Sequence, residues 1–494
     1  MTGIARTADA IPARAPRASR LHAAQRILLS SLVALAGVVS ILIAPGPGGC
    51  VATEETSAAR EAPRQPSAPT STPSDGSTGG GTASATAPAS ASAPVPRPLP
   101  APPEHEPLVR VRIGDSVAVG ELRFDHPQHF VWLAQPGTGN SATMATPIAV
   151  SRASDGWIVT GRAGTEPAVR RFDAARPLEV HPLADADQSI VWDAITWPGS
   201  ITLHPTSTGV DVVDQVKLED YVPGVIAKEL LPAWDINAYR AQAVAARSYA
   251  LVEMDRWAAR RHFDVVAGER NQAFVGVTTR PQAVQGASST RGQVLVFDGK
   301  VVPAYYSSCC GGRGANVADS VSSNPHHDIW PLRSGDHGPR LSEVCCEGAK
   351  PRAWSVELRE ADLRERLRAW GRAIHSKAAS GLGRIVSVQR AHDNSAGRAI
   401  DYVVRDADGH SFTVPAEDLR VALNRYAPKG AATVRSGDFE VRTSGNGRWS
   451  LDGLGFGHGC GMCQYGAQAM ARSGADYRKI LARYYPGADI VVAW

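Results

Sequence analysis

The stretch that decides the fold reads DINAYRAQAVAARSYALV and covers residues 235–252. Asp235 is a favourable N-cap, and the residues after it predict a helix through residues 238–261. Alanine, valine and leucine cover nearly its whole circumference, which is typical of a helix buried in a core. Arg240 and Arg247 share one face of it, so we expect carboxylates or an anionic ligand opposite them. A purely structural ion pair would meet the same requirement.

A short helix is predicted just before, over residues 220–230. It stops at Leu231-Pro232 because proline cannot continue a helix. Glu229 stands at its C-terminal end, where the helix dipole and apolar neighbours such as Trp234 both favour a protonated carboxyl. A general acid requires such a carboxyl at neutral pH. The alternative is an ordinary solvated glutamate at a helix end.

A glycine-rich segment lies near the C-terminus, where residues 453–467 read GLGFGHGCGMCQYGA. Five glycines in nine residues allow the backbone to approach a large, flat ligand closely. His458, Gln464 and Tyr465 add groups that can form hydrogen bonds. The pattern matches neither a phosphate-binding loop nor a haem attachment site. A tight structural turn explains the glycines equally well.

The charge balance argues against a nucleic-acid-binding protein. The 494 residues suffice for two or three domains, and the formal net charge is +4. Residues 1–49 hold five of the 52 basic residues and one of the 48 acidic residues, so the remainder carries 47 of each. The excess is therefore a targeting feature rather than a phosphate-neutralising surface.

Residues 1–50 predict an export signal. An arginine-rich start leads into an apolar run over residues 27–44, and two glycines then precede Cys50. This ending favours lipidation of Cys50 as in a bacterial lipoprotein, although Pro47 stands where leucine is usual. An uncleaved signal anchor and ordinary cleavage are the alternatives. All three place the rest of the chain outside the cytoplasm, at the cell envelope.

The remaining chain divides by composition, and the fold class we expect is α+β. Residues 51–106 are rich in Pro, Ser, Ala, Thr and Gly, so they predict a disordered linker. Residues 107–215 show short alternating runs typical of strands, and residues 216–494 form the core that carries the motifs. There we expect strands at 292–297 and 301–306, an irregular loop at 320–350, hairpins at 384–414, and helices at 360–374, 417–426, 466–472 and 477–484.

Six cysteines remain beyond Cys50, namely Cys309, Cys310, Cys345, Cys346, Cys460 and Cys463. In an exported protein these are first of all disulfide candidates. Neighbouring residues of a strand point to opposite faces, so one of Cys309 and Cys310 could bridge to Cys345 or Cys346. The other members of these pairs could then reach Cys460 and Cys463. Zinc held by four of these thiols, with His326, His327 or His337 as further ligands, is one alternative. Free thiols are another, and a redox role for Cys460 and Cys463 finds no thioredoxin-like context.

Three stretches, in order, resemble the SpoIID/LytB family of sporulation and amidase-enhancer proteins. They are residues 218–225 with Glu229 and residues 241–250, then Cys310-Gly311-Gly312, and finally residues 455–467. The resemblance covers about residues 107–494. The chain departs from the family pattern at several positions. Arg240 replaces a common lysine, and Ser307 replaces a histidine that joins cysteines around zinc in some members. Residues 330–333 replace a Tyr-Leu-Lys stretch, and Cys460 and Cys463 stand where Val or Ile and Ser are more common.

The resemblance implies a lytic transglycosylase that acts on peptidoglycan glycan strands stripped of stem peptides. Glu229 matches the family's catalytic glutamate and Arg247 its supporting arginine. We expect the substrate-binding residues Arg240, His458, Gln464, Tyr465 and, in a variant of a family motif, Arg333. The second function that the resemblance implies is a non-catalytic enhancer of a cell-wall amidase. Neither function requires a cofactor. The chain would associate with the membrane through its N-terminal anchor.

Overall fold

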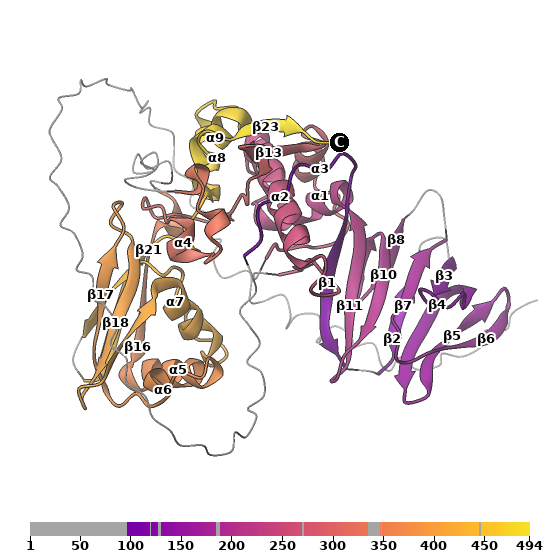
Figure 1. Cartoon of the computed structure of the whole chain (residues 1–494), viewed down its shortest axis with the longest axis horizontal. Helices are drawn as coiled ribbons and strands as arrows, with labels where there is room; N and C mark the ends of the chain where they lie inside the picture. The colour runs from indigo at the N-terminus through magenta and orange to yellow at the C-terminus, as the bar shows by residue number, and fades with distance from the viewer. Residues whose placement is uncertain are drawn as a thin grey trace, which may run out of the picture. The chain divides into compact units, whose positions relative to one another are not determined.

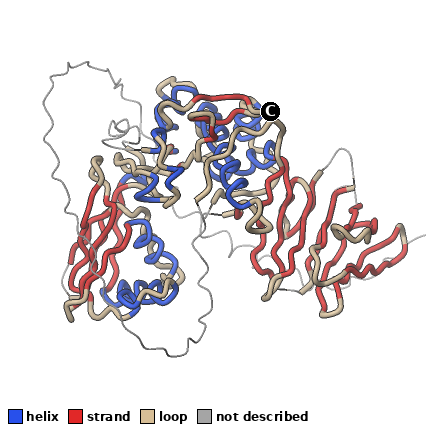
Figure 2. The backbone as a smooth tube through the Cα atoms, viewed as in Figure 1, coloured by secondary structure: helices blue, strands red, loops and turns tan. Residues whose placement is uncertain are grey.

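The computed structural model describes residues 96–494 apart from 119, 127–129, 184–187, 269–270, 334–345, 347 and 444–445. Helices and strands are both abundant in this part, so the predicted α+β class is confirmed (Figures 1 and 2). The predicted export signal and residues 51–95 of the predicted linker lie outside the described residues. No helix within the described residues is long and apolar enough to span a membrane.

A twelve-stranded sheet accounts for most of residues 108–217 and is mainly antiparallel. Near one end of this sheet, β1 and β11 pair antiparallel from Leu108 opposite Lys217 to Val117 opposite Val210. Six of the eight residues of β11 are buried, so both faces of this strand are covered. The alternation of apolar and polar residues along it is therefore weak. The strands are β1 (Leu108–Val117), β2 (Leu122–Asp125), β3 (Phe130–Ala134), β4 (Ser141–Ala153), β5 (Gly156–Ala163), β6 (Glu166–Phe172), β7 (Leu178–Pro182), β8 (Ser189–Trp192), β9 (Ile195–Pro198), β10 (Ser200–Pro205), β11 (Val210–Lys217) and β12 (Val265–Val266).

The helix predicted from the deciding stretch and the short helix predicted before it both form. Helix α1 (Leu218–Glu229) follows β11 directly, and α2 (Ile236–Trp257) begins after Asp235, whose side chain accepts a hydrogen bond from the Asn237 N–H. Helix α2 ends four residues earlier than the sequence pattern predicts. Both helices share one hydrophobic core with the large sheet and with α3 (Pro281–Ser288), α8 (Gln464–Arg472) and α9 (Tyr477–Tyr484).

Short strands join distant parts of the chain around α2. Strand β13 (Gln293–Phe297) pairs with both β14 (Lys300–Val301) and the C-terminal β23 (Asp489–Val492). Strand β15 (Tyr306–Ser307) runs parallel to β22 (Met462–Cys463) and so holds the glycine-rich segment. The continuous strand predicted over 301–306 is thus wrong, because the chain leaves the sheet after Val301. The predicted irregular loop lies between α4 (Val317–Ser320) and the 3₁₀ turn η4 (Lys350–Arg352), and it contains the short 3₁₀ turns η1 (Pro325–His327) and η2 (Trp330–Leu332).

Residues 353–454 build a second hydrophobic core, which the sequence patterns do not separate from the first. Two three-stranded sheets and helices α5 and α7 enclose it, with Leu367, Tyr402 and Leu423 at its centre (Figure 1). Its elements are β16 (Ala353–Arg359), α5 (Glu360–Ala373), α6 (Lys377–Ser380), β17 (Ile385–Asp393), β18 (Ala399–Asp406), β19 (Ser411–Pro415), α7 (Ala416–Arg425), β20 (Phe439–Thr443) and β21 (Arg448–Leu454).

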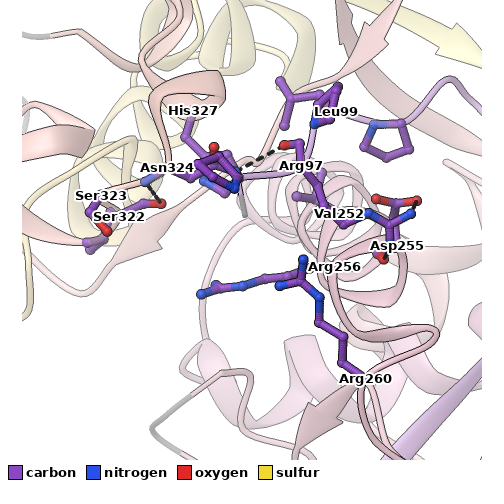
Figure 3. Close-up of a pocket in the computed structure, with 14 residues that line it drawn as sticks. Arg97, Leu99, Val252, Asp255, Arg256, Arg260, Ser322, Ser323, Asn324 and His327 are labelled. Carbon is purple, nitrogen blue, oxygen red and sulfur yellow. Dashed lines mark hydrogen bonds and ion pairs between the residues drawn. The ribbon is translucent and has the colours of Figure 1, made fainter. Parts of the chain in front are cut away.

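Residues 96–106, assigned to the linker by composition, contact the folded part. Leu99 belongs to the first core, and the Pro100 carbonyl accepts a hydrogen bond from the Val301 N–H at 2.8 Å. Together with residues 321–324, His327 and the C-terminal end of α2, this segment lines a cavity of about 190 Å³ (Figure 3). The folded part therefore begins before residue 107. The proline-rich composition of this segment gave no sign that Leu99 would be buried.

Candidate functional site

Glu229 is the last residue of α1 and lies where three segments meet. Its side chain is partly exposed. The Ala273 N–H donates a hydrogen bond to Oε1 at 3.1 Å, and the Gln464 side-chain amide donates one to Oε2 at 3.1 Å. Donors at both oxygens favour the charged carboxylate, and so oppose the effect expected from the helix end and the apolar neighbours. They also fix the orientation of the carboxyl group.

Buried amides and phenols extend this arrangement. Gln464 also approaches Gln242 Oε1 at 3.5 Å, and the Gln242 Nε2 atom is buried with no hydrogen-bond partner in the described part of the chain. The Gln272 amide donates to the Tyr306 hydroxyl at 3.0 Å and accepts from Tyr221 at 3.2 Å. Burial, followed by the nearby Glu229 charge, raises the pKa of Tyr306 well above its usual value, so the phenol stays neutral.

The sequence reasoning did not single out Gln242, Gln272 or Tyr306. A signal existed only for Gln242, which is a lone amide on an otherwise apolar stretch of α2. A buried amide needs partners, so it marks either a structural network or a ligand. Gln272 and Tyr306 stand in segments without a motif, and the folded chain alone brings them to Glu229.

Arg247 forms the buried ion pair that the sequence left open. It is fully buried in α2, and its guanidinium donates to both carboxylate oxygens of Glu219, at 3.0 and 2.7 Å. Its remaining donors reach Thr290 Oγ1 at 3.0 Å and the Ala287 carbonyl at 2.8 Å. Every nitrogen of the guanidinium is thus engaged with α1 or with the end of α3, which favours the structural interpretation of this arginine.

Arg240 and Arg333 are both partly buried, and their described hydrogen bonds go to residues other than Glu229. Arg240 donates to Ser289 Oγ at 3.0 Å and Asn237 Oδ1 at 3.4 Å. Neither contact is the expected carboxylate, and the alternative of an anionic ligand stays a prediction. Arg333 forms a two-pronged ion pair with Asp328, at 2.8 and 2.9 Å, which raises its pKa. The structure brings neither arginine to Glu229 through these contacts.

His458 is engaged by the backbone through both ring nitrogens. Nδ1 accepts from the Cys460 N–H at 3.1 Å, so Nε2 donates to the Tyr306 carbonyl at 2.9 Å. Burial lowers the pKa of His458 to about 4 and keeps the ring neutral. These contacts give His458 a role in shaping the glycine-rich segment.

Tyr465 lies beside the site. Its ring meets Trp234 edge to face with centroids 5.0 Å apart, and burial raises its pKa. The backbone of this segment is tightly confined, because Gly461 has a φ of +68° and a Cβ there would run into the Tyr305 carbonyl oxygen. Among the predicted site residues, the structure thus joins Glu229 and Gln464 directly, and Tyr465 follows Gln464 in the chain.

Four of the cysteines converge, although the described ones are free thiols. The sulfurs of Cys309, Cys346 and Cys463 lie within 4.8 Å of one another, and Cys310 Sγ lies 3.7 Å from Cys346 Sγ. Hydrogen bonds with the surrounding thiols hold the pKa of Cys346 well below its usual range, and the contact with Cys346 raises that of Cys309 to about 12.

The cysteine geometry corrects two expectations. Cys309 and Cys310 both approach Cys346 instead of pointing to opposite faces, because β15 ends at Ser307 and the chain bends. Cys460 contacts Ser320 and is not part of the cluster, and burial raises its pKa to about 12. Cys50, Cys345 and His337 lie outside the described residues.

Comparison with known proteins gives consistent matches. The family model described as SpoIID, stage II sporulation protein, matches residues 206–297, which include Glu229 and Arg247. An uncharacterized protein of Brachyspira hyodysenteriae is 32% identical over 301 residues, which cover 60% of this chain and 73% of that protein. Stage II sporulation protein D of Bacillus subtilis is 25% identical over 313 residues, covering 59% of this chain and 79% of that protein.

A further relative is the amidase enhancer of Bacillus subtilis, 26% identical over 295 residues, which cover 54% of this chain and 40% of that protein. The family match begins between β10 and β11 and contains both α1 and α2. By these likenesses, and by the order of its motifs, the chain belongs to the SpoIID/LytB family.

Proposed function

We propose that this chain is a cell-wall protein that cleaves peptidoglycan glycan strands as a lytic transglycosylase. The observation that carries the proposal is the carboxyl group of Glu229, partly exposed and held at both oxygens by Ala273 and Gln464. The family match across this region supports it. The proposed substrate is the glycan strand stripped of its stem peptides.

The proposed reaction needs one carboxyl group that changes role. Glu229 donates its proton to the oxygen that leaves the muramic acid C1 atom when the β-1,4 bond breaks. The C6 hydroxyl of the same muramic acid attacks C1, and Glu229 takes up the hydroxyl proton. The product is a 1,6-anhydro ring, and no water is consumed. Hydrolytic glycosidases usually need a second carboxylate, which this route does not require.

Glu229→Gln tests the assignment. Glutamine keeps the shape and can still accept hydrogen bonds, but it cannot cycle a proton. We expect glycan cleavage to fall by roughly 10²–10⁴-fold, the range typical of general acid–base catalysis. Mass analysis of digested peptide-free strands for anhydro ends is the measurement. The matched control is Glu357→Gln, an exposed carboxyl paired with Arg448, which should cleave like wild type. Near-wild-type cleavage by Glu229→Gln would rule the assignment out.

A second candidate function is a non-catalytic enhancer of a cell-wall amidase. The likeness to a protein named amidase enhancer favours it. In that case Glu229→Gln should still bind glycan strands and stimulate the amidase as wild type does, and wild type itself should leave no anhydro ends. Analysis of digested glycan strands for anhydro ends therefore distinguishes the two functions.

We further propose that the chain is exported and tethered to the membrane, with lipidated Cys50 as the anchor. The sequence of residues 1–50 supports this proposal. Cys50→Ser should abolish incorporation of a radiolabelled fatty acid and release the protein from the membrane fraction. Retention of the variant in that fraction would instead favour an uncleaved signal anchor.

A further inference from the structure

The cavity beside the C-terminal end of α2 is lined by three segments that are far apart in the sequence, at residues 96–100, 252–260 and 321–327 (Figure 3). Its volume of about 190 Å³ is several times the roughly 30 Å³ that one water molecule occupies in the liquid. We propose that this cavity binds a phosphate dianion, either free or attached to a sugar as a monoester. The cavity shares no residue with the candidate site at Glu229, so the inference goes beyond the proposed function.

The lining of the cavity carries an excess of positive charge. Among the described residues it holds three arginines and one acidic residue, Asp255, which leaves two positive charges. The arginines are Arg97, Arg256 and Arg260. His327 adds no charge at neutral pH, because burial and the nearby Arg256 charge lower its pKa to about 4. A phosphate monoester carries about two negative charges at this pH, whereas a single carboxylate carries one, so the balance favours phosphate.

The arginines reach the cavity from separate parts of the chain. Arg97 crosses to α2, where it pairs with the Asp255 carboxylate at 3.6 Å and donates to the Asp255 carbonyl oxygen. Arg256 and Arg260 are four residues apart at the end of α2, so they share one side of it. The helix dipole favours cations at this end of α2, but it does not account for Arg97, which lies 158 residues from Asp255 in the sequence.

Two of these guanidinium groups can take up a ligand without losing a buried partner. The side chains of Arg97 and Arg256 are 41% and 44% exposed. Arg256 uses one nitrogen to contact Glu253 at 3.3 Å, and Glu253 also accepts hydrogen bonds from Trp257 and Asn271. A planar guanidinium can donate two parallel hydrogen bonds to one phosphate, so arginines from two segments can hold it together.

Neutral donors and apolar groups complete the lining. Residues 322–324 supply two hydroxyl groups and one amide. The Asn324 amide donates to the Arg97 carbonyl at 3.2 Å and so ties this loop to the segment that carries Arg97. Leu99 and Val252 are buried apolar residues of the same lining. A few polar groups beside apolar ones suit a phosphate that is attached to a carbon skeleton, such as that of a sugar.

A bound phosphate would fix residues 96–100 against α2, because it would join Arg97 to Arg256. The same segment is held by the Pro100 carbonyl, which accepts a hydrogen bond from the Val301 N–H at 2.8 Å. Ligand binding should therefore slow hydrogen exchange of the Val301 amide.

The test is isothermal titration calorimetry of the full chain in phosphate-free buffer, at about pH 7.5 and a constant ionic strength of about 0.15 M. The probes are inorganic phosphate and glucose 6-phosphate, and the controls are acetate and glucose. We expect one phosphate site per chain and slower exchange of the Val301 amide. Equal affinity for the two probes supports the proposal with free phosphate as the ligand, and tighter binding of glucose 6-phosphate supports it with a phosphorylated sugar.

Variants from two segments locate the site. Arg256→Gln should weaken phosphate binding at least about tenfold, as expected for the loss of a charge-assisted hydrogen bond. Arg97→Gln should do the same, and it leaves α2 intact if Arg256→Gln fails to fold. The matched control is Arg372→Gln, which removes an exposed arginine from the last turn of α5 and should bind phosphate like wild type.

Three results would overturn the proposal: wild type that binds neither phosphate probe, acetate that binds as tightly as phosphate, or wild-type phosphate affinity in the folded Arg97→Gln and Arg256→Gln variants. Glu229→Gln should bind phosphate like wild type. Failure of this proposal is therefore distinguishable from failure of the proposed function.

Discussion

Removing the Arg247 guanidinium should destabilise the fold strongly, because the group is the buried partner of Glu219. Arg247→Met keeps most of the volume but removes four hydrogen bonds, two of them to the Glu219 carboxylate at 3.0 and 2.7 Å. The Glu219 side chain is 5% exposed, so its charge would remain buried, with the Gly292 N–H as a donor at 2.9 Å. Breaking such a pair costs about 3–5 kcal/mol of unfolding free energy.

Urea unfolding followed by tryptophan fluorescence measures this loss. The matched control is Arg240→Met on the same helix, whose guanidinium is half-buried and bonded only to neutral groups, Ser289 and Asn237, in the contacts described here. We expect it to cost less than about 1 kcal/mol. Adding Glu219→Gln to Arg247→Met removes the unpaired charge and keeps an acceptor for Gly292, so it should restore at least about 1 kcal/mol.

The outcome that refutes this reasoning is specific. If Arg247→Met unfolds at the wild-type urea concentration while its glycan cleavage is abolished, the ion pair contributes little and Arg247 acts in catalysis. If the double variant is no more stable than Arg247→Met, the buried carboxylate of Glu219 is not the source of the loss.

Three further predictions concern the site and its surroundings. Gln464→Leu removes a donor that favours the charged form of Glu229, so the falling alkaline limb of the pH–rate profile should move up by as much as about one pH unit. Burial lowers the pKa of His327 to about 4, so the neutral ring stabilises the fold above about pH 6.5 and this contribution is lost as the pH falls toward 4. His327→Gln should therefore reduce the loss of unfolding free energy between pH 7 and pH 5 by about 2 kcal/mol, measured by urea titrations at both pH values. Gly461→Ala should cost at least about 2 kcal/mol because a Cβ meets a backbone carbonyl at positive φ, whereas Gly474→Ala, at φ +89° in open space, should cost about 1 kcal/mol in the same assay.

Local patterns predicted the helices well because their signals are short-range. Asp235 caps α2 through its own side chain, Pro232 ends the preceding helix, and the helix over 477–484 forms with the predicted bounds. The hairpins of 384–414 likewise follow from turn residues between alternating strands. The division into two cores did not follow from local patterns, because strands such as β16 and β21 acquire their buried faces only by pairing with residues 89 to 101 positions away.

For the candidate site, too, some features follow from the sequence and others only from the tertiary structure. The sequence by itself determined the identity of Glu229, its place at a helix end, and the glycines that let residues 455–461 adopt positive φ. Only the tertiary structure decided the partners, because hydrogen bonds and ion pairs depend on groups brought together from distant segments. In the folded chain Arg247 pairs with Glu219, and both ring nitrogens of His458 form hydrogen bonds with the backbone. Gln464 donates a hydrogen bond to Glu229, which lies 235 residues away in the sequence.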